Sequence, residues 1–288
     1  MAKTSKVLVL GASGMLGNAV FRLLSASSGH EVVGAVRSPA ALKLFPQPLQ
    51  SSLISGVDAG DFDSVTRVFS TERPDVIINC IGVVKQRTGA DDVLATVPTN
   101  SLLPHRLARL CAVAGARLVQ ISTDCVFSGR KGSYIEDDVP DAIDLYGRSK
   151  LMGEVDYANA VTLRTSIVGH ELSGQQSLVG WFLAQQGSVR GYQNAIFSGI
   201  PTVELARIIR DHVIPRPALR GVYHVSAQPI SKLALLELIA CVYGKSIVII
   251  PDEELIIDRS LDSSRFRAAT GYQPESWKIL VRKMFEFG

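Results

Sequence analysis

A tyrosine and a lysine stand four residues apart, at Tyr146 and Lys150, with Tyr146 23 residues after Thr123. On a helix, residues i and i+4 lie on the same face, so both side chains would point into one site. A free phenol has a pKa of about 10, and a neighbouring ammonium favours the phenolate and lowers that pKa. The pattern predicts a site that moves a proton on or off an oxygen, bordered by Thr123. Taken alone, this spacing also fits an ordinary helix surface.

The N-terminal residues predict a nucleotide site that such a proton donor could serve. Residues 6–10 form a branched apolar run, typical of a buried parallel strand, and a glycine-rich turn and an apolar helical pattern follow. Gly11 permits the tight turn, Gly14 lets the backbone approach a pyrophosphate, and Gly17 lets the helix pack close to the sheet. The helix N-terminus then offers N–H groups to the phosphates. The expected dinucleotide contacts in this turn are Gly11, Ser13, Gly14, Met15, Leu16 and Gly17.

Later strand ends add contacts for the rest of the dinucleotide. Arg37 follows the second expected strand, residues 31–36, where a basic residue accommodates a 2′-phosphate. The sequence therefore favours NADP(H), with NAD(H) left open. Asp58 ends the third expected strand and could accept a hydrogen bond from the adenine amino group. The fourth expected strand, residues 76–82, ends in Cys80, Ile81 and Gly82 beside the cofactor.

These elements alternate with helices in the order of a doubly wound, parallel Rossmann sheet of the α/β class. Residues 117–121 and 160–167 supply the fifth and sixth expected strands. Asn100 or Ser101 is expected to cap a helix that runs to Ala114, with Gly115 just past its end.

We expect two domains. Residues 1–168, with a return segment at about 196–221, form the dinucleotide-binding domain, and residues 169–195 and 222–288 form a smaller α/β substrate lobe. Short strands of that lobe are expected at 222–225 and 247–250. Trp181 lies on an expected helix of the lobe, where it could stack on a sugar or base, although core packing is the commoner fate of tryptophan.

As a set, these motifs resemble the extended short-chain dehydrogenase/reductase family, and within it the nucleotide-sugar 4-ketoreductases of the dTDP-4-dehydrorhamnose reductase type. Residues 122–127 match that group's Ser-Thr-Asp-x-Val-Phe stretch, and residues 146–150 match its Tyr-Gly-x-Ser-Lys stretch, followed by Gly153 and Glu154. Residues 259–262 resemble, more loosely, an Arg-containing region that contacts substrate.

The resemblance implies an oxidoreductase that passes a hydride from NADP(H) to the C4 keto carbon of a nucleotide-linked 6-deoxy sugar, in polysaccharide or glycan biosynthesis. Tyr146 would protonate the carbonyl oxygen, Lys150 would lower the pKa of Tyr146 and bind the nicotinamide ribose, and Thr123 would bind the same oxygen. The implied catalytic residues are Thr123, Tyr146 and Lys150, and the expected substrate-binding residues are Thr123, Asp124, Trp181 and Arg259.

Two alternatives stay open at this point. The related 4,6-dehydratases have Glu where this chain has Cys125, which disfavours a dehydratase. The GDP-fucose synthase type has Cys there and uses it with a His, so Cys125 and His170 could form an epimerising pair. The other alternative is a non-catalytic, NADP-binding regulatory subunit, since fold does not fix function.

Composition sets the remaining expectations. The net charge is only +3, without a basic run, so we expect no nucleic-acid partner. The histidines and the four cysteines show no metal-ligand spacing, and free thiols favour a cytoplasmic protein. No apolar segment is long enough to span a membrane. Family members often pair, which makes a homodimer an expectation.

Overall fold

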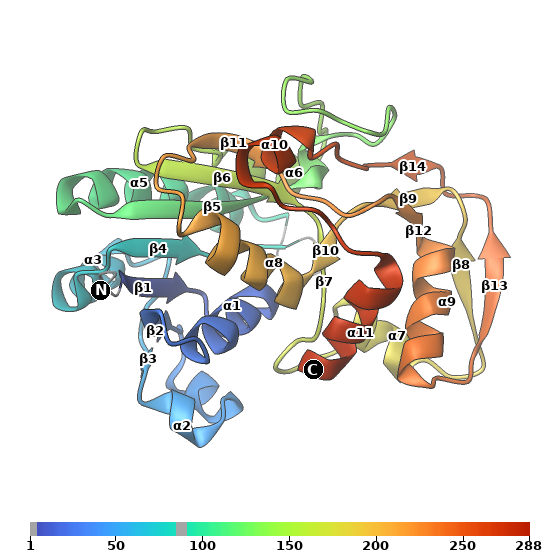
Figure 1. Ribbon diagram of the computed structural model, residues 1–288, viewed down its shortest axis with the longest axis horizontal. Coiled ribbons are helices and arrows are strands. Elements are labelled where there is room, and N and C mark those ends of the chain that lie inside the picture. The colour runs from blue at the N-terminus through green and yellow to red at the C-terminus, as the bar shows by residue number, and fades with distance from the viewer. Residues whose placement is uncertain (1–4, 85–90) are drawn as a thin grey trace.

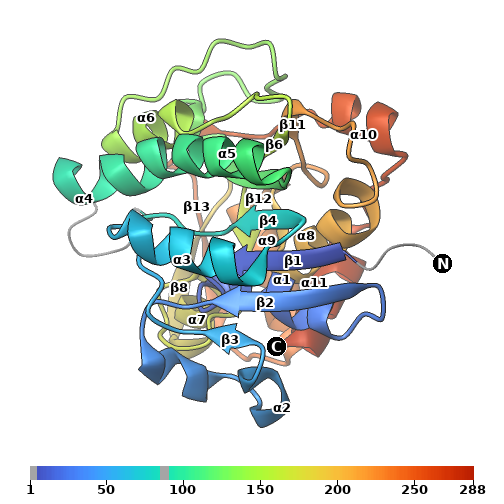
Figure 2. The ribbon, with the colours of Figure 1, turned by 90° about the vertical axis from the view of Figure 1, so that its left-hand side faces the viewer.

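The computed structural model describes residues 5–84 and 91–288 of the 288-residue chain. Its centre is a seven-stranded sheet in the order β11-β6-β5-β4-β1-β2-β3, in which every neighbouring pair is parallel (Figure 1). Figure 2 shows β4, β1, β2 and β3 following one another across this sheet. The predicted doubly wound α/β sheet is confirmed. The strands are β1 (Ser5–Leu10), β2 (His30–Ala35), β3 (Leu53–Ile54), β4 (Val76–Asn79), β5 (Arg117–Thr123), β6 (Ala160–Thr165) and β11 (Gly221–His224).

Helices cover both faces of the sheet. Apolar residues of α1 and α8 share one buried cluster with one face, and apolar residues of α3 and α5 share a second cluster with the other. Strands buried on both faces need the near-continuous apolar runs that β1 and β4 carry. The covering helices and their extensions are α1 (Met15–Ser25), α3 (Phe62–Glu72), α4 (Val93–Val97), the π-helix η2 (Pro98–Leu102), α5 (Leu103–Ala114), α8 (Thr202–Ile208) and the π-helix η4 (Ile209–Val213).

A smaller group of elements lies to the right of the large sheet in Figure 1. In it, β8 pairs with β13, and β9 lies between β12 and β14. Its bounds are α7 (Leu178–Ala184), β8 (Ser188–Tyr192), β9 (Ala195–Phe197), β12 (Ile230–Ser231), α9 (Lys232–Tyr243), β13 (Val248–Asp252) and β14 (Ile257–Asp258). The remaining elements are η1 (Pro39–Leu44), α2 (Gln47–Gln50), η3 (Asp124–Val126), α6 (Leu145–Met152), β7 (Ile167–Val168), β10 (Ile200–Pro201), α10 (Ser264–Thr270) and α11 (Trp277–Phe287).

The structure corrects three expected elements. The strand expected at 222–225 of the small lobe is β11, which pairs with β6 in the large sheet. The third strand ends at Ile54 rather than Asp58, because Gly56 turns the chain with a φ of 80°. The helix expected to begin at Asn100 or Ser101 begins at Val93 instead, where the Asp92 carboxylate accepts the Leu94 N–H at 2.9 Å.

Gly115 ends that helix as predicted, with a left-handed φ of 69°. Asn100 lies inside the continued helix, and its side chain makes hydrogen bonds to two other segments instead of capping the helix. Its amide nitrogen donates to Ser149 Oγ at 3.1 Å, and its oxygen accepts the Val83 N–H at 2.9 Å. Asn100 thereby joins the segment after β4 to helix α6, which carries Tyr146 and Lys150.

Candidate active site

The glycine turn between β1 and α1 has the geometry expected of a dinucleotide site. Gly11 has a φ of 75°, and its N–H donates to the Ala35 carbonyl at the end of β2 at 3.1 Å. A Cβ on Gly17 would collide with the Gly11 carbonyl oxygen, so only glycine permits this approach of helix to turn. Gly14 caps α1 without a side chain, which leaves the first-turn N–H groups, those of Met15 and Leu16 among them, to face a ligand.

The turn lies against the end of β4, as the sequence predicted for residues 80–82. A Cβ on Gly11 would come within 3.0 Å of Ile81 Cγ1, and one on Gly82 would lie 4.0 Å from Lys150 Nζ. Lys150 in turn donates from Nζ to the Ile121 carbonyl of β5 at 2.6 Å. The ends of β1, β4 and β5 and helix α6 therefore meet around one space. The missing Cβ atoms at Gly11 and Gly17 allow this close packing, and the free N–H groups at the start of α1 fit a dinucleotide pyrophosphate.

Thr123, at the end of β5, connects the tyrosine to the strand. Its hydroxyl donates to Asp124 Oδ1 at 3.1 Å, accepts the Cys125 N–H at 3.1 Å, and hydrogen-bonds the Tyr146 phenol. Tyr146 and Lys150 lie on α6, whose first turn is capped by Asp144 through the Gly147 N–H at 2.8 Å. The predicted helical placement of the pair is therefore confirmed.

Burial dominates the electrostatics of the pair. The pKa of Tyr146 lies above its ordinary value, mainly because of burial and then because of Cys125. Burial lowers the pKa of Lys150 itself to about 8, against the charges of Glu154 and Cys80. Tyr146 is consequently a protonated phenol at neutral pH, the form that an acid requires.

The predicted adenosine contacts lie outside this central group. Arg37 is exposed just beyond β2, and its carbonyl accepts the Gly56 N–H at 3.2 Å. Asp58 is half-buried, receives the Gly60 N–H at 2.9 Å, and follows the turn after β3. Both positions suit the distal end of a dinucleotide that starts at the glycine turn.

The substrate side of the site contains Arg259, which follows β14. Its Nε donates to the Phe127 carbonyl at 2.9 Å, and its Nη1 lies 3.7 Å from Cys125 Sγ. It also acts electrostatically on Asp124. Trp181 lies on α7 with 37 % of its surface exposed, tilted against Phe182, and no contact joins it to Thr123 or Tyr146 among the described residues.

The structure does not bring Cys125 and His170 together. His170 Nε2 lies 2.8 Å from the Tyr243 hydroxyl, its ring packs against the terminal Gly288, and its pKa is lowered by burial and by Arg22. Cys125 instead lies among Arg259, Tyr146, Asp124 and Lys232. The hypothesis of an epimerising pair is therefore wrong, because β7 and the following loop direct His170 toward α9 and the C-terminus.

Lys232, the first residue of α9, belongs to the site although the sequence reasoning missed it. Its Nζ lies 3.9 Å from the ring centre of Phe197, and it interacts electrostatically with Asp124 and Cys125. Burial lowers the pKa of Lys232 to about 8. The only local signal was Ser231, whose hydroxyl caps α9 by accepting the Ala234 N–H at 3.1 Å.

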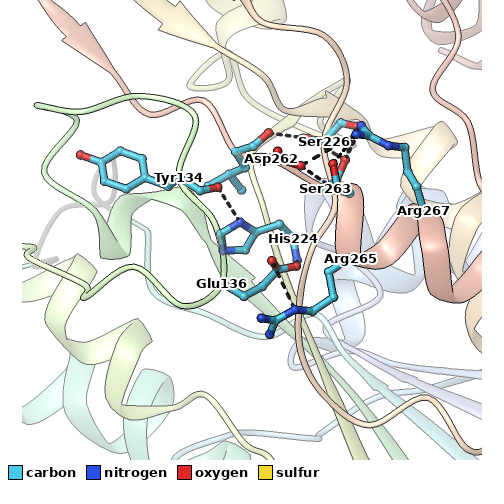
Figure 3. A network of polar contacts seen from close by, with 10 residues as sticks. Tyr134, Glu136, His224, Ser226, Asp262, Ser263, Arg265 and Arg267 are labelled. Carbon is cyan, nitrogen blue, oxygen red and sulfur yellow. Dashed lines mark hydrogen bonds and ion pairs between the residues drawn. The ribbon is translucent and has the colours of Figure 1, made fainter.

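A polar network around His224 joins the loop after Phe127 to the end of β11 and to α10 (Figure 3). His224, at the end of β11, donates from Nδ1 to the Tyr134 carbonyl at 3.0 Å, and its Nε2 lies 3.3 Å from Arg164 Nη1. Burial and the nearby Arg164 lower the pKa of His224 to about 4, so the ring is neutral. Glu136 accepts the His224 N–H at 2.8 Å and faces Arg265 of α10. The network thereby fixes the loop after Phe127 to the segment around Arg259.

The fold and this site together define an α/β dehydrogenase/reductase of the short-chain type. Residues 5–286 match the family described as RmlD substrate binding domain, so the chain belongs to that family.

The relatives in sequence include beta subunits of methionine adenosyltransferase 2 and reductases. Methionine adenosyltransferase 2 subunit beta of Danio rerio is 30% identical over 241 residues, which cover 77% of this chain and 69% of that protein. The match to the subunit of the same name from Rattus norvegicus covers 52% of this chain and only 41% of that protein, at 32% identity. A probable low-salt glycan biosynthesis reductase of Haloferax volcanii is 33% identical over 178 residues, covering 60% of this chain and 57% of that protein.

Solved structures share the fold over nearly the whole chain. A dTDP-4-dehydrorhamnose reductase of Bacillus anthracis in complex with NADP superposes with a TM-score of 0.80 at 21% identity, covering 99% of this chain and 100% of that one. A hypothetical dTDP-4-dehydrorhamnose reductase of Sulfolobus tokodaii gives a TM-score of 0.77 at 27% identity, covering 94% and 98%. Among the helices of the described residues, none has the length and apolar character to cross a membrane.

Proposed function

We propose that this chain is an NADP(H)-dependent oxidoreductase that reduces the C4 keto group of a nucleotide-linked 6-deoxy sugar, in polysaccharide or glycan biosynthesis. The observation that carries the proposal is the hydrogen bond of Thr123 to the Tyr146 phenol, in the space that Lys150 and Gly82 border. The names of the reductases among the relatives and solved structures support the substrate class.

Different residues of the site bind the cofactor and the sugar nucleotide. When bound, the nicotinamide cofactor supplies the hydride. The turn from Gly11 to Gly17 and the N-terminus of α1 hold the pyrophosphate, and Arg37 holds the 2′-phosphate. Lys150, fixed by the Ile121 carbonyl, holds the nicotinamide ribose. Asp124, Arg259 and Trp181 contact the sugar nucleotide.

Tyr146 delivers the proton to the carbonyl oxygen. Burial keeps its phenol protonated at neutral pH, and Thr123 holds that phenol at the end of β5. As negative charge develops on the keto oxygen, the Tyr146 proton moves to it, and the ammonium of Lys150 stabilises the resulting phenolate. A positioned acid of this kind contributes roughly 10²–10⁴ in rate.

A panel of nucleotide 4-keto-6-deoxy sugars with NADPH tests the proposal. We expect oxidation of NADPH with at least one member, and a product two hydrogens heavier by mass spectrometry. NADPH binding without oxidation across the panel would contradict it.

That contradictory result would favour a second candidate, a non-catalytic regulatory subunit. The observation behind it is that several relatives are beta subunits of methionine adenosyltransferase 2. Against it, this chain has both Tyr146 and Lys150, and the structure brings them to one site. Co-purification with a catalytic methionine adenosyltransferase chain, together with no NADPH oxidation, would establish the second candidate.

We place the enzyme in the cytoplasm as a homodimer. All four cysteines are free thiols, as expected where disulfides are reduced. Helix α4, η2 and α5 expose Leu94, Leu102 and Val113 respectively, apolar side chains that a second copy would cover. Light scattering of the purified chain measures the assembly directly, and a monomeric mass would contradict the dimer.

A further inference from the structure

The hydrogen-bond ladder between β4 and β5 opens just before the two strands reach the cofactor site. At the start of the pairing, the Arg117 N–H donates to the Asp75 carbonyl at 2.9 Å. The bonds of a parallel ladder are evenly spaced and repeat every two residues along both strands, which would later join the Ile81 N–H to the Ile121 carbonyl. The regular pairing ends before that step, and each of these two backbone groups has a different partner.

The side-chain amides of Asn79 and Gln120, the last paired residues of the two strands, fill the gap. The Ile81 N–H donates to Asn79 Oδ1 at 3.1 Å. Asn79 Nδ2 donates to Gln120 Oε1 at 2.8 Å, and Gln120 Nε2 donates to the Ile121 carbonyl at 3.0 Å. Both side chains are only 1 % exposed, so their polar atoms depend on these partners. The chain runs from a backbone donor to a backbone acceptor, which fixes the order of nitrogen and oxygen in both amides.

The Ile121 carbonyl at the end of this chain is also the anchor of Lys150. A carbonyl oxygen has two lone pairs, and Lys150 Nζ donates to this one at 2.6 Å beside the bond from Gln120. A continued ladder would bring the Ile81 N–H to the same oxygen as a competitor. The opening of the ladder therefore gives the buried ammonium of Lys150 its place at the end of β5.

We infer that Asn79 and Gln120 are positioning residues for Lys150: their linked amides hold β4 and β5 apart at this end of the sheet and reserve the Ile121 carbonyl for the ammonium. This role deepens the proposed function and rests on it only for the effect on the cofactor. The anchoring itself is a property of the protein without ligand, so it can be tested separately.

The variant Asn79→Leu/Gln120→Leu tests the anchoring directly. It replaces both partners of a buried hydrogen bond with apolar groups, which proteins tolerate better than the loss of one partner. The Ile81 N–H and the Ile121 carbonyl can then pair with each other. We expect a crystal structure of the variant to show that backbone bond, with Lys150 Nζ withdrawn from the carbonyl. An intact bond from Lys150 to Ile121 would overturn the inference, whether or not the protein reduces any sugar.

The effect on the cofactor is measured by fluorescence titration with NADPH. We expect the double variant to raise the Kd about tenfold, the effect of disturbing a hydrogen bond to a charged group. In the Lys150→Met background the same two substitutions should raise the Kd by at most about twofold, because the ammonium that they position is gone. An undiminished loss in that background would show that the amides support only the fold, and would refute the positioning role.

Two further variants keep the test decisive. Gln120→Met leaves Asn79 in place and carries the same cycle as a milder change if the double variant does not fold. Thr162→Val is the matched control, because it removes another buried hydrogen bond of the large sheet, from the Thr162 hydroxyl to the Val155 carbonyl at 2.7 Å. It should lower the free energy of unfolding and leave the Kd for NADPH unchanged. A wild-type protein that does not bind NADPH would refute the proposed function, while the crystal structure still decides the anchoring.

Discussion

Lys150 Nζ donates to the carbonyl oxygen of Ile121 at 2.6 Å, which fixes the ammonium of α6 to the strand that carries Thr123. The bond explains how a lysine with a pKa lowered to about 8 by burial keeps a defined place beside Gly82.

Lys150→Met should therefore reduce both cofactor affinity and turnover. The variant removes the ammonium that donates a hydrogen bond to the Ile121 carbonyl. It also removes the positive charge that binds the nicotinamide ribose and stabilises the Tyr146 phenolate. We expect kcat/KM to fall by about 10² or more, and NADPH binding by fluorescence to weaken. Lys278→Met, on an exposed helix face, should leave both quantities at wild-type values. Wild-type turnover in Lys150→Met would remove Lys150 from the site.

The glycine turn permits a test with a matched control. A Cβ on Gly17 would collide with the Gly11 carbonyl, so Gly17→Ala should lower the free energy of unfolding by about 1–3 kcal/mol and abolish tight NADPH binding. Gly29, in the turn before β2, has open space around it, and Gly29→Ala should change neither. Chemical denaturation and fluorescence titration measure the two effects. Equal behaviour of the two variants would contradict the assigned role of the turn.

Arg37 should decide between the two dinucleotides. Because it is exposed beyond β2, Arg37→Glu leaves the fold intact while it opposes a 2′-phosphate. We expect the Kd for NADPH to rise about tenfold or more while the Kd for NADH stays the same or falls. Lys43→Glu, an exposed lysine of η1, controls for the overall change in charge. A uniform loss for both cofactors would contradict the 2′-phosphate contact.

His224 should make the protein sensitive to acid. Its pKa is about 4 in the folded chain against an ordinary 6.5, so between these values the unfolded chain binds a proton that the folded chain does not. The free energy of unfolding should therefore fall as pH decreases through that window, by on the order of 3 kcal/mol from this residue. Urea unfolding of wild type and His224→Asn at several pH values checks this. A variant with the same pH slope as wild type would show that His224 is not the sensitive group.

Sequence patterns predicted those parts of the site whose residues lie within one short segment of the chain. The turn from Gly11 to Gly17 is a strand–turn–helix unit, and the pair Tyr146 and Lys150 needs only one helix, so spacing alone places each of them. The end of β4 followed from the order of strands in a parallel sheet.

The remaining features depend on contacts between distant segments. The raised pKa of Tyr146 comes from burial, which no local pattern reports. Lys232 enters from the small lobe through the packing of α9. His170, which the sequence offered as a partner for Cys125, lies against Tyr243 of α9 because of a contact between distant segments.

The central claim is that Tyr146 protonates a keto oxygen while its carbon receives the cofactor's hydride. Its most direct test supplies NADPH deuterated at the transferred position together with nucleotide 4-keto-6-deoxy sugars, and locates the label in the product by NMR and mass spectrometry. We predict one deuterium at C4 of the sugar with wild type. Tyr146→Phe should bind NADPH as wild type does and form product slower by about 10² or more. A product without deuterium at C4, or a Tyr146→Phe variant with wild-type turnover, would contradict the account.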